Sequence, residues 1–231
     1  QMSFTLPAPA SEEARVAARV LMEKMGFANV RVITMESLGT DFSFFVVYGA
    51  SPITIDLREI DVPKLEYPQY SFIEINKMLP EKLGRKAIVL GACIGSDAHT
   101  VGIDAIFNMK GYLGDYGLER YSAFQAINLR SQVAIDDLVK KIIDMRADAV
   151  LISRVVTQRD EHISELKNFL LALQNAQNVP AHLIRVCGGP RITHQEALEL
   201  GYDAGFGPGT KPSHVASYLA TELVRRLDGK K

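Results

Sequence analysis

Segment 91–102 carries the residues most able to do chemistry, arranged as Asp97-x-His99-x-x-Gly102 after an apolar run. An imidazole can ligate a metal through one ring nitrogen while a nearby carboxylate accepts a hydrogen bond from the other, which fixes the tautomer and raises the basicity of the ligand. The third fixed residue, Gly102, lets the backbone pass close to a large planar ring. The pattern therefore indicates a histidine that ligates the metal of a planar cofactor, such as a cobalt corrin, from below.

Small and polar residues follow most of the other expected strands. Ser153-Arg154-Val155 follows one strand, Gly188 and Gly189 follow the next, and a glycine-rich run at 205–209 follows the last. Loops at the carboxyl ends of parallel strands meet at one edge of a sheet, so these residues predict a groove there for a long inserted chain with a nucleotide-like end. Segment 91–95 does not match Gly-x-Gly-x-x-Gly, which makes dinucleotide binding a poor interpretation.

The elements that must position these residues come from residues 83–231, where short apolar runs alternate with amphipathic stretches. We expect strands at 86–92, 124–129, 149–153, 182–187 and 204–206, and helices at 101–110, 133–146, 161–174, 193–200 and 214–227. This alternation predicts an α/β domain with a doubly wound, parallel, five-stranded, Rossmann-like sheet.

Residues 1–62 predict a separate, small α+β domain. A helix is expected over 11–26 with Ser11 as its N-cap. Strands are expected at 30–35, 42–48 and 53–57. Residues 63–82, with three prolines, are interpreted as the connecting segment. Because a unit of about 60 residues is near the lower limit for folding alone, we expect it to pack on another surface.

The composition narrows the class of protein. The chain has 231 residues, of which 47% are hydrophobic, and its formal net charge of −1 gives no support to nucleic-acid binding. No apolar run approaches the ~20 residues of a membrane span, and the first residues lack a signal-peptide pattern. Cys93 and Cys187 fall within or at the end of strand-like runs, as expected for buried, reduced thiols of a cytoplasmic protein.

Three motifs together resemble those of the cobalamin-binding domain shared by base-off, histidine-on mutases and corrinoid methyltransferases. They are Asp97-x-His99-x-x-Gly102, Ser153-x-Val155 and Gly188-Gly189, with Ser-x-Val in place of the usual Ser-x-Leu. In that family the lower dimethylbenzimidazole leaves the cobalt and enters a groove, and the histidine replaces it. The resemblance implies that His99 is the axial cobalt ligand. It implies the following cofactor-binding residues: Gly95, Ser96, Asp97, His99, Thr100, Gly102, Ile103, Ser153, Val155, Gly188, Gly189, Gly207 and Gly209.

A longer resemblance covers nearly the whole chain. Segments 44–49, 97–121, 187–192 and 202–209 resemble the β subunits of lysine 5,6-aminomutases. That family implies two cofactors, adenosylcobalamin and pyridoxal 5′-phosphate, and a catalytic Lys110 that carries pyridoxal phosphate as a Schiff base, eleven residues after His99. The glycines of segment 111–117 would give Lys110 a flexible backbone on which to move.

The same resemblance implies the reaction and the assembly. The reaction is a radical 1,2-amino shift of the terminal amine of D-lysine or L-β-lysine in lysine degradation, which makes the enzyme an isomerase. The first domain would serve in dimerisation, and a separate, larger α subunit with a barrel fold would complete a cytoplasmic heterotetramer. The resemblance implies neither a nucleic-acid partner nor a membrane.

Other functions stay open at this point. A corrinoid carrier for methyl transfer, or a cobalamin sensor, would use Asp97 and His99 but not Lys110, and commonly carries a helical bundle before the corrin domain. The corrin domain of ornithine 4,5-aminomutase looks much the same but is fused to its barrel, whereas this chain has 231 residues. A regulatory subunit that has lost its cofactors would not need the intact motifs.

Isolated charged residues and histidines outside the motifs receive simpler interpretations. We expect Arg154 and residues 159–161 to form a solvated loop face, since a run of charges usually faces water. Surface or capping roles are expected for His162, His182, His194 and His214.

Overall fold

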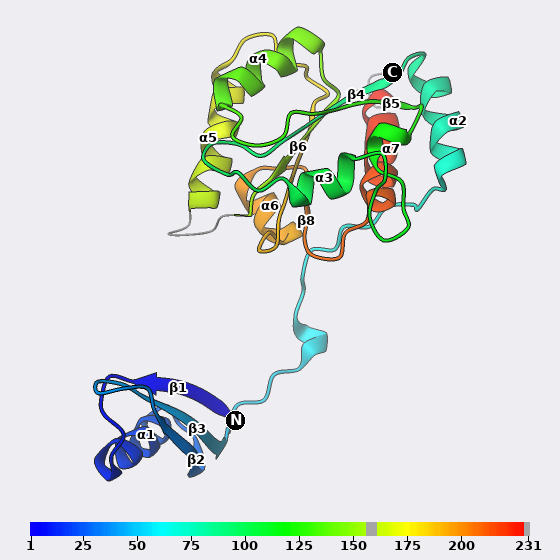
Figure 1. Ribbon diagram of the computed structural model, residues 1–231. Helices are drawn as coiled ribbons and strands as arrows, with labels where there is room; N and C mark the ends of the chain where they lie inside the picture. The colour runs from blue at the N-terminus through cyan, green and yellow to red at the C-terminus, as the bar shows by residue number, and fades with distance from the viewer. Residues whose placement is uncertain (156–160, 229–231) are drawn as a thin grey trace. The chain divides into compact units, whose positions relative to one another are not determined.

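The computed structural model describes residues 1–155 and 161–228 of the chain. The chain divides into two compact units, Gln1–Asp61 and Val62–Lys231, and each has a hydrophobic core of its own (Figure 1). Within the described residues, no helix combines the length and the apolar character that crossing a membrane requires.

The first unit is a three-stranded antiparallel sheet with one helix packed on it. Its elements are β1 (Met2–Leu6), α1 (Glu12–Lys24), β2 (Ala28–Ser37) and β3 (Ser43–Ala50), and the strand order is β1-β3-β2. The Ser11 side chain accepts a hydrogen bond from the N–H of Ala14 at 3.2 Å, so the expected N-cap is confirmed. Ala18 and Met22 of α1 pack against Phe45 of β3 to form the core of the unit.

The strand expected at 53–57 is absent, and strand β1 (Met2–Leu6) was not expected from the sequence. Segment 53–57 forms no strand, and a short 3-10 helix η1 (Leu57–Glu59) begins at its end. The reason is that β3 already pairs with β1 on one side and β2 on the other, which leaves the following segment no adjacent edge. The apolar alternation that favoured a strand, with Ile53, Ile55 and Leu57, is exposed instead.

The second unit contains the expected parallel sheet, and the doubly wound α/β fold is confirmed. Its strands are β4 (Ala87–Ala92), β5 (Phe124–Asn128), β6 (Ala149–Ser153), β7 (Ile184–Gly188) and β8 (Ala204–Phe206), in the order β5-β4-β6-β7-β8. From β4 the chain moves outward to β5 and then returns to β6 on the other side. This reversal creates a switch point between β4 and β6, where sheets of this kind bind ligands.

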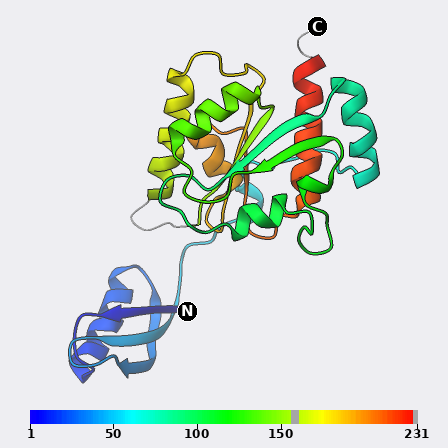
Figure 2. The ribbon, with the colours of Figure 1, turned by 45° about the horizontal axis from the view of Figure 1, so that its top comes forward.

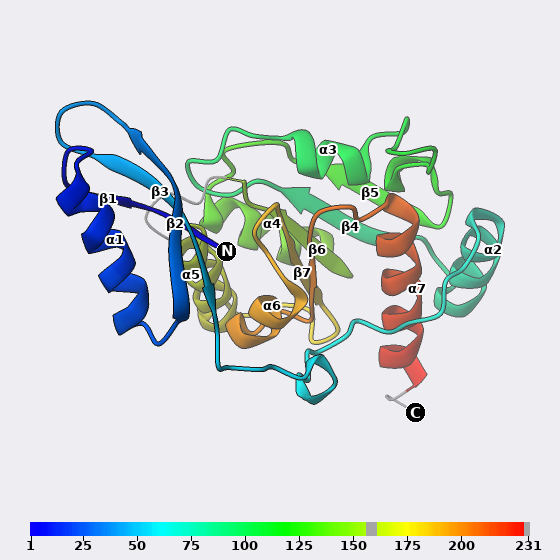
Figure 3. The ribbon, with the colours of Figure 1, turned by 90° about the horizontal axis from the view of Figure 1, so that it is seen from below.

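Helices cover both faces of this sheet (Figure 2). They are α2 (Phe72–Leu83), α3 (Val101–Phe107), α4 (Ile135–Met145), α5 (Glu161–Asn175), α6 (His194–Leu200) and α7 (Pro212–Asp228), with the short 3-10 helix η2 (Leu118–Arg120) before β5. Side chains of α2, α3 and α7 form the core on one face, and those of α4, α5 and α6 form the core on the other. Figure 3 shows the ribbons of these two groups of helices on opposite sides of the sheet. Helix α2 lies within the expected connecting segment, and its Ile75 and Leu79 are buried in the core of the second unit.

A buried carboxylate fixes the opposite, amino-terminal edge of the sheet. Asp148 is 1% exposed and accepts hydrogen bonds from both terminal nitrogens of Arg85 at 2.6 and 2.7 Å, and from the N–H of Ile88 at 2.7 Å. Its Oδ1 lies 2.8 Å from Nε2 of His182, so this histidine has a structural role rather than the expected surface or capping role. Burial alone would raise the pKa of Asp148, but these hydrogen bonds outweigh it and lower that pKa below its ordinary value.

Candidate functional site

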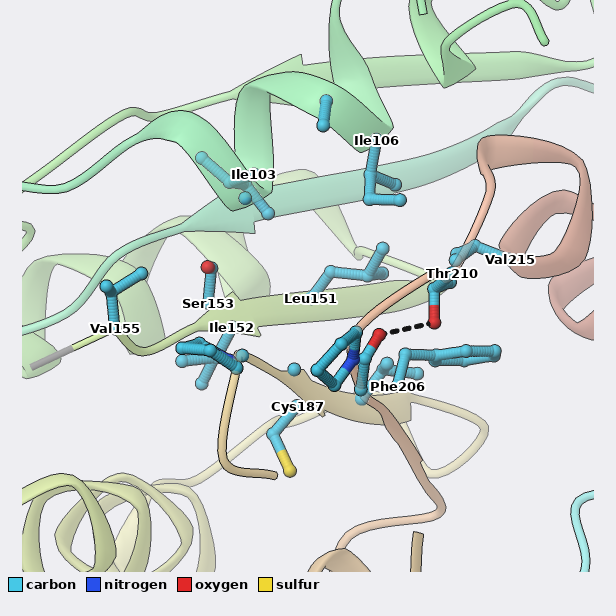
Figure 4. A pocket seen from close by; sticks show the side chains of 18 of the residues that line it. Ile103, Ile106, Leu151, Ile152, Ser153, Val155, Cys187, Phe206, Thr210 and Val215 are labelled. Atoms are coloured by element: carbon cyan, nitrogen blue, oxygen red, sulfur yellow. Dashed lines mark hydrogen bonds between the residues drawn. The ribbon is translucent and has the colours of Figure 1, made fainter. Parts of the chain in front are cut away.

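A groove of about 430 Å³ opens at the carboxyl ends of β6, β7 and β8 and is bounded by α3. Figure 4 shows Ile103 and Ile106 of α3 on one side of this groove, with Leu151 and Phe206 on the sheet side. Several expected cofactor-binding residues line it: Gly102, Ile103, Ser153, Val155, Gly188, Gly189, Gly207 and Gly209. The lining is mostly apolar, which suits an extended organic group rather than a compact anion.

The remaining expected residues lie in the loop that joins β4 to α3: Gly95, Ser96, Asp97, His99 and Thr100. Buried Cys93 begins this loop, and its thiol donates a hydrogen bond to the carbonyl oxygen of His99 at 3.2 Å. Thr100 stands at the N-cap of α3 without a capping hydrogen bond from its side chain. The loop therefore leaves the sheet at the switch point and ends beside the groove.

Asp97 and His99 form the pair that the motif predicts. Oδ1 of the fully buried Asp97 accepts the backbone N–H of His99 and lies 3.0 Å from its Nδ1, while Oδ2 accepts the backbone N–H of Val155 at 2.7 Å. The imidazole is 58% exposed. Because Nδ1 faces the carboxylate, Nε2 is the nitrogen left to ligate a metal.

The spacing of α3 from β6 depends on the motif glycine. A Cβ placed on Gly102 would lie 2.8 Å from Oγ of Ser153, which is closer than real Cβ contacts come. Glycine therefore lets the first turn of α3 approach the end of β6, and the groove runs between them.

Lys110 lies outside α3, because that helix ends at Phe107 rather than at the expected residue 110. Its side chain is exposed and does not line the groove. Its backbone N–H donates a hydrogen bond to Oδ1 of Asn108 at 3.0 Å. The structure thus places Lys110 on the surface, in a turn that follows α3.

The loop after Lys110 is tightly closed. Tyr112 and Asp115 exchange two backbone hydrogen bonds, each of 3.1 Å, and Oγ of Ser213 on α7 donates a hydrogen bond to Oδ2 of Asp115. A Cβ on Gly111 would lie only 1.6 Å from the carbonyl oxygen of Asp115. The glycines here permit close backbone packing, whereas the sequence had suggested that they provide flexibility.

Besides that of His182, two further expectations about charged or polar side chains are wrong. Arg154 is 1% exposed instead of on a solvated face, and its Nη1 lies 4.0 Å from Oδ2 of Asp97. His162 is buried at 7% exposure. The available signal was position: β6 is buried at every residue, so the residue directly after it begins in the interior. Glu161 is exposed as expected, whereas residues 159–160 lie outside the described residues.

His194 and His214 accept hydrogen bonds from backbone N–H groups, and both cysteines are buried. His214 accepts the N–H of Lys211 at 3.4 Å beside the first turn of α7, which is the expected capping role. His194 accepts the N–H of Gly205 at 3.2 Å at the start of α6. Both cysteines are free and buried, and burial raises the pKa of Cys93 to about 11 and that of Cys187 to about 12.

Comparison with known proteins identifies the two units and the chain. Residues 1–64 match the family described as the dimerisation domain of D-ornithine 4,5-aminomutase, and residues 87–216 match the B12-binding domain family. The chain is 27% identical over 230 residues to the β subunit of D-ornithine 4,5-aminomutase from Acetoanaerobium sticklandii, which covers 98% of this chain but 30% of that protein.

Two relatives match over nearly their whole length. The lysine 5,6-aminomutase β subunit of Fusobacterium nucleatum is 49% identical over 226 residues, which covers 98% of this chain and 86% of that protein. The corresponding subunit of Acetoanaerobium sticklandii is 44% identical over 228 residues, which covers 99% of this chain and 87% of that protein. At this identity and coverage, the chain belongs to the family of lysine 5,6-aminomutase β subunits.

Proposed function

We propose that this chain is the cobalamin-carrying subunit of an isomerase that moves the terminal amine of D-lysine or L-β-lysine to the neighbouring carbon. The observation that carries the proposal is the Asp97–His99 pair, which stands at the switch point of a B12-binding fold in a chain 49% identical to a lysine 5,6-aminomutase β subunit. This family membership favours the aminomutase over a corrinoid carrier for methyl transfer or a cobalamin sensor.

The residues of the site fit cobalamin. His99 offers one exposed imidazole with its Nδ1 held by a buried carboxylate, as a single axial ligand requires. The groove beside it is apolar and walled by glycines, which suits the displaced nucleotide tail of the cofactor. When bound, adenosylcobalamin supplies radical chemistry through its cobalt–carbon bond. In this chain, His99 would hold the cobalt, Asp97 would orient the imidazole, and the apolar groove would exclude water from the tail.

We further propose that Lys110 binds pyridoxal 5′-phosphate through its Nζ. The support is its match to the family motif and its exposed position in a closed turn, where a cofactor held mainly by another subunit could reach it. Bound pyridoxal phosphate supplies a carbonyl group that joins covalently to amines and can delocalise an unpaired electron. Lys110 would hold pyridoxal phosphate through its Nζ and would release the cofactor to the amine of the substrate.

The proposed assembly follows from the two matched families. The first unit would self-associate, as the description of its family indicates, and a separate α subunit with a barrel fold would supply the rest of the substrate site. We propose a cytoplasmic heterotetramer of two such pairs.

A corrinoid carrier has no use for Lys110, so modification of this lysine by pyridoxal phosphate distinguishes the aminomutase from a corrinoid carrier.

The decisive experiment is electron paramagnetic resonance of the purified chain loaded with cob(II)alamin, with the histidines labelled with ¹⁴N or ¹⁵N. A nitrogen superhyperfine pattern that changes with the label and disappears in His99→Ala supports the proposal. His214→Ala is the matched control, because its ring bonds only to a helix end in the described residues, and the pattern should persist. A pattern that ignores the label would contradict a protein ligand on cobalt. Aminomutase activity is then measured with the α subunit on both lysines.

A further inference from the structure

A buried ion pair lies beside Asp97, the carboxylate that contacts the proposed cobalt ligand. Arg154 directly follows β6 and is among the largest fully buried side chains of the chain. Its Nη1 lies 2.6 Å from Oε2 of Glu165 on α5 and donates a hydrogen bond to the carbonyl oxygen of Ile94 at 2.8 Å. The same nitrogen lies 4.0 Å from Oδ2 of Asp97. One guanidinium therefore touches the β4–α3 loop, α5 and the surroundings of the motif carboxylate.

Such a pair is costly to bury, because both charges leave water. The contact to Glu165 is close but not aligned as a hydrogen bond, and Nε and Nη2 of Arg154 have no hydrogen-bond partner in the part of the chain that the structure describes. The pair is thus not an optimised stabilising bridge, which points to a role other than stability.

Two motif glycines lie close to the residues of the pair. A Cβ on Gly95 would lie 2.2 Å from Oε1 of Glu165, and a Cβ on Gly189 would lie 2.0 Å from the carbonyl oxygen of Arg154. A side chain at Gly95 would displace the Glu165 carboxylate, and one at Gly189 would displace the backbone of Arg154. Both glycines also have positive φ, which disfavours a side chain at either position. Two glycines that the motif assigns to cofactor binding therefore also lie against Arg154 and Glu165.

The charges explain how the pair can act on His99. The carboxylate of Asp97 is fully buried and must keep Oδ1 on the imidazole. Arg154 supplies a compensating positive charge 4.0 Å from the other oxygen. Glu165 holds the guanidinium at 2.6 Å, and so prevents Arg154 from closing on Asp97 and competing with His99 for it.

We propose that Arg154 and Glu165 are positioning residues for the cobalt ligand: Arg154 balances the charge of Asp97, and Glu165 restrains Arg154 so that Asp97 stays on His99. The inference rests on the proposed binding of cobalamin through His99. It assigns no contact with the cofactor to either residue.

The test is Glu165→Gln, which keeps the shape of the side chain and removes its charge. Arg154 should then move toward Asp97, and the affinity of His99 for cobalt should fall by about tenfold, the usual effect of removing an outer-shell partner. The readouts are the fraction of cob(II)alamin with a histidine nitrogen in its paramagnetic resonance spectrum and the binding curve of cob(II)alamin. Glu222→Gln is the matched control, since Glu222 pairs with Arg225 and Arg226 on α7.

The outcomes separate the two proposals. A lowered histidine-bound fraction in Glu165→Gln, with an unfolding temperature equal to that of Glu222→Gln, supports the positioning role. An unchanged fraction overturns it. If the wild-type chain itself shows no histidine nitrogen on cobalt, the proposed function fails as well. Should Glu165→Gln not fold, Arg154→Lys is the second test. The lysine side chain is one bond shorter up to its terminal nitrogen, so the contacts that Nη1 makes with Ile94 and Glu165 should lengthen and the fraction should again fall. No change in the fraction would refute the proposal.

Discussion

Replacing Asp97 by asparagine should disable the cobalt ligand without removing it. Among the described residues, the carboxylate oxygens of Asp97 face the backbone N–H groups of His99 and Val155 and Nδ1 of the imidazole. Asparagine keeps the size of the side chain but retains only one acceptor oxygen. Whichever way its amide turns, an NH₂ group meets an N–H group that needs an acceptor.

The magnitude follows from the two orientations. If the amide oxygen stays on Val155, the backbone N–H of His99 loses its acceptor, and Nδ1 can only accept, which puts the ring proton on Nε2 where cobalt should bind. If the oxygen turns to His99, the N–H of Val155 is left unpaired. A buried donor without a partner costs about 1–3 kcal/mol, so we expect a loss of about 2 kcal/mol. For a domain of this size this corresponds to a fall of about 4–8 °C in unfolding temperature.

The assay is thermal unfolding without cobalamin, followed by electron paramagnetic resonance with cob(II)alamin. Asp97→Asn should unfold several degrees lower and show a reduced histidine contribution. Asp137→Asn, an exposed carboxylate in the first turn of α4, is the control and should change stability by about 0.5 kcal/mol at most. An unchanged unfolding temperature together with an unchanged nitrogen pattern would refute the hydrogen-bond reasoning.

Three further predictions follow from groups already described. The lowered pKa of Asp148 makes its stabilisation complete above its unfolded-state pKa of about 3.9 and lost as the pH falls through the folded value, so Asp148→Asn should flatten the acid limb of an unfolding curve. Gly102→Ala should weaken cob(II)alamin binding by about tenfold, because its Cβ would crowd Ser153, while circular dichroism shows unchanged helix content. Cys93 and Cys187 should resist a thiol reagent such as dithionitrobenzoate until the protein unfolds, since burial keeps both thiols neutral.

The parallel sheet could be predicted because most of its strands are short apolar runs that are largely buried. β6 is buried at all its residues, and the alternation of such runs with helices leaves few topologies. The first unit was harder. β1 begins at Met2 and pairs with β3, a contact between distant residues, whereas the apolar alternation at 53–57 looked like a strand by local pattern alone. Pairing partners decide strands, and a local pattern does not contain them.

In the candidate site too, contacts between residues close in the sequence could be predicted, and contacts between distant residues could not. The hydrogen bond between Asp97 and His99 is local, two residues apart, so the motif contains it. The bond from the N–H of Val155 to Asp97 joins residues far apart in the chain, and only the parallel pairing of β4 with β6 brings them together. Lys110 was expected near a helix end, but α3 stops at Phe107.

The surroundings of Arg154 show that glycines of a cofactor-binding motif can also be needed for packing inside the protein. Arginine is rarely buried, so its type argued for a solvated loop, and nothing in the sequence links it to Glu165 eleven residues later. Yet the space that Gly95 and Gly189 leave is filled by Glu165 and by the backbone of Arg154. Gly95 packs directly on the Glu165 carboxylate, so a side chain at Gly95 would disturb the ion pair beside Asp97 even without any contact with the corrin. The motif thus contains residues that pack around the proposed cobalt ligand as well as the ligand itself.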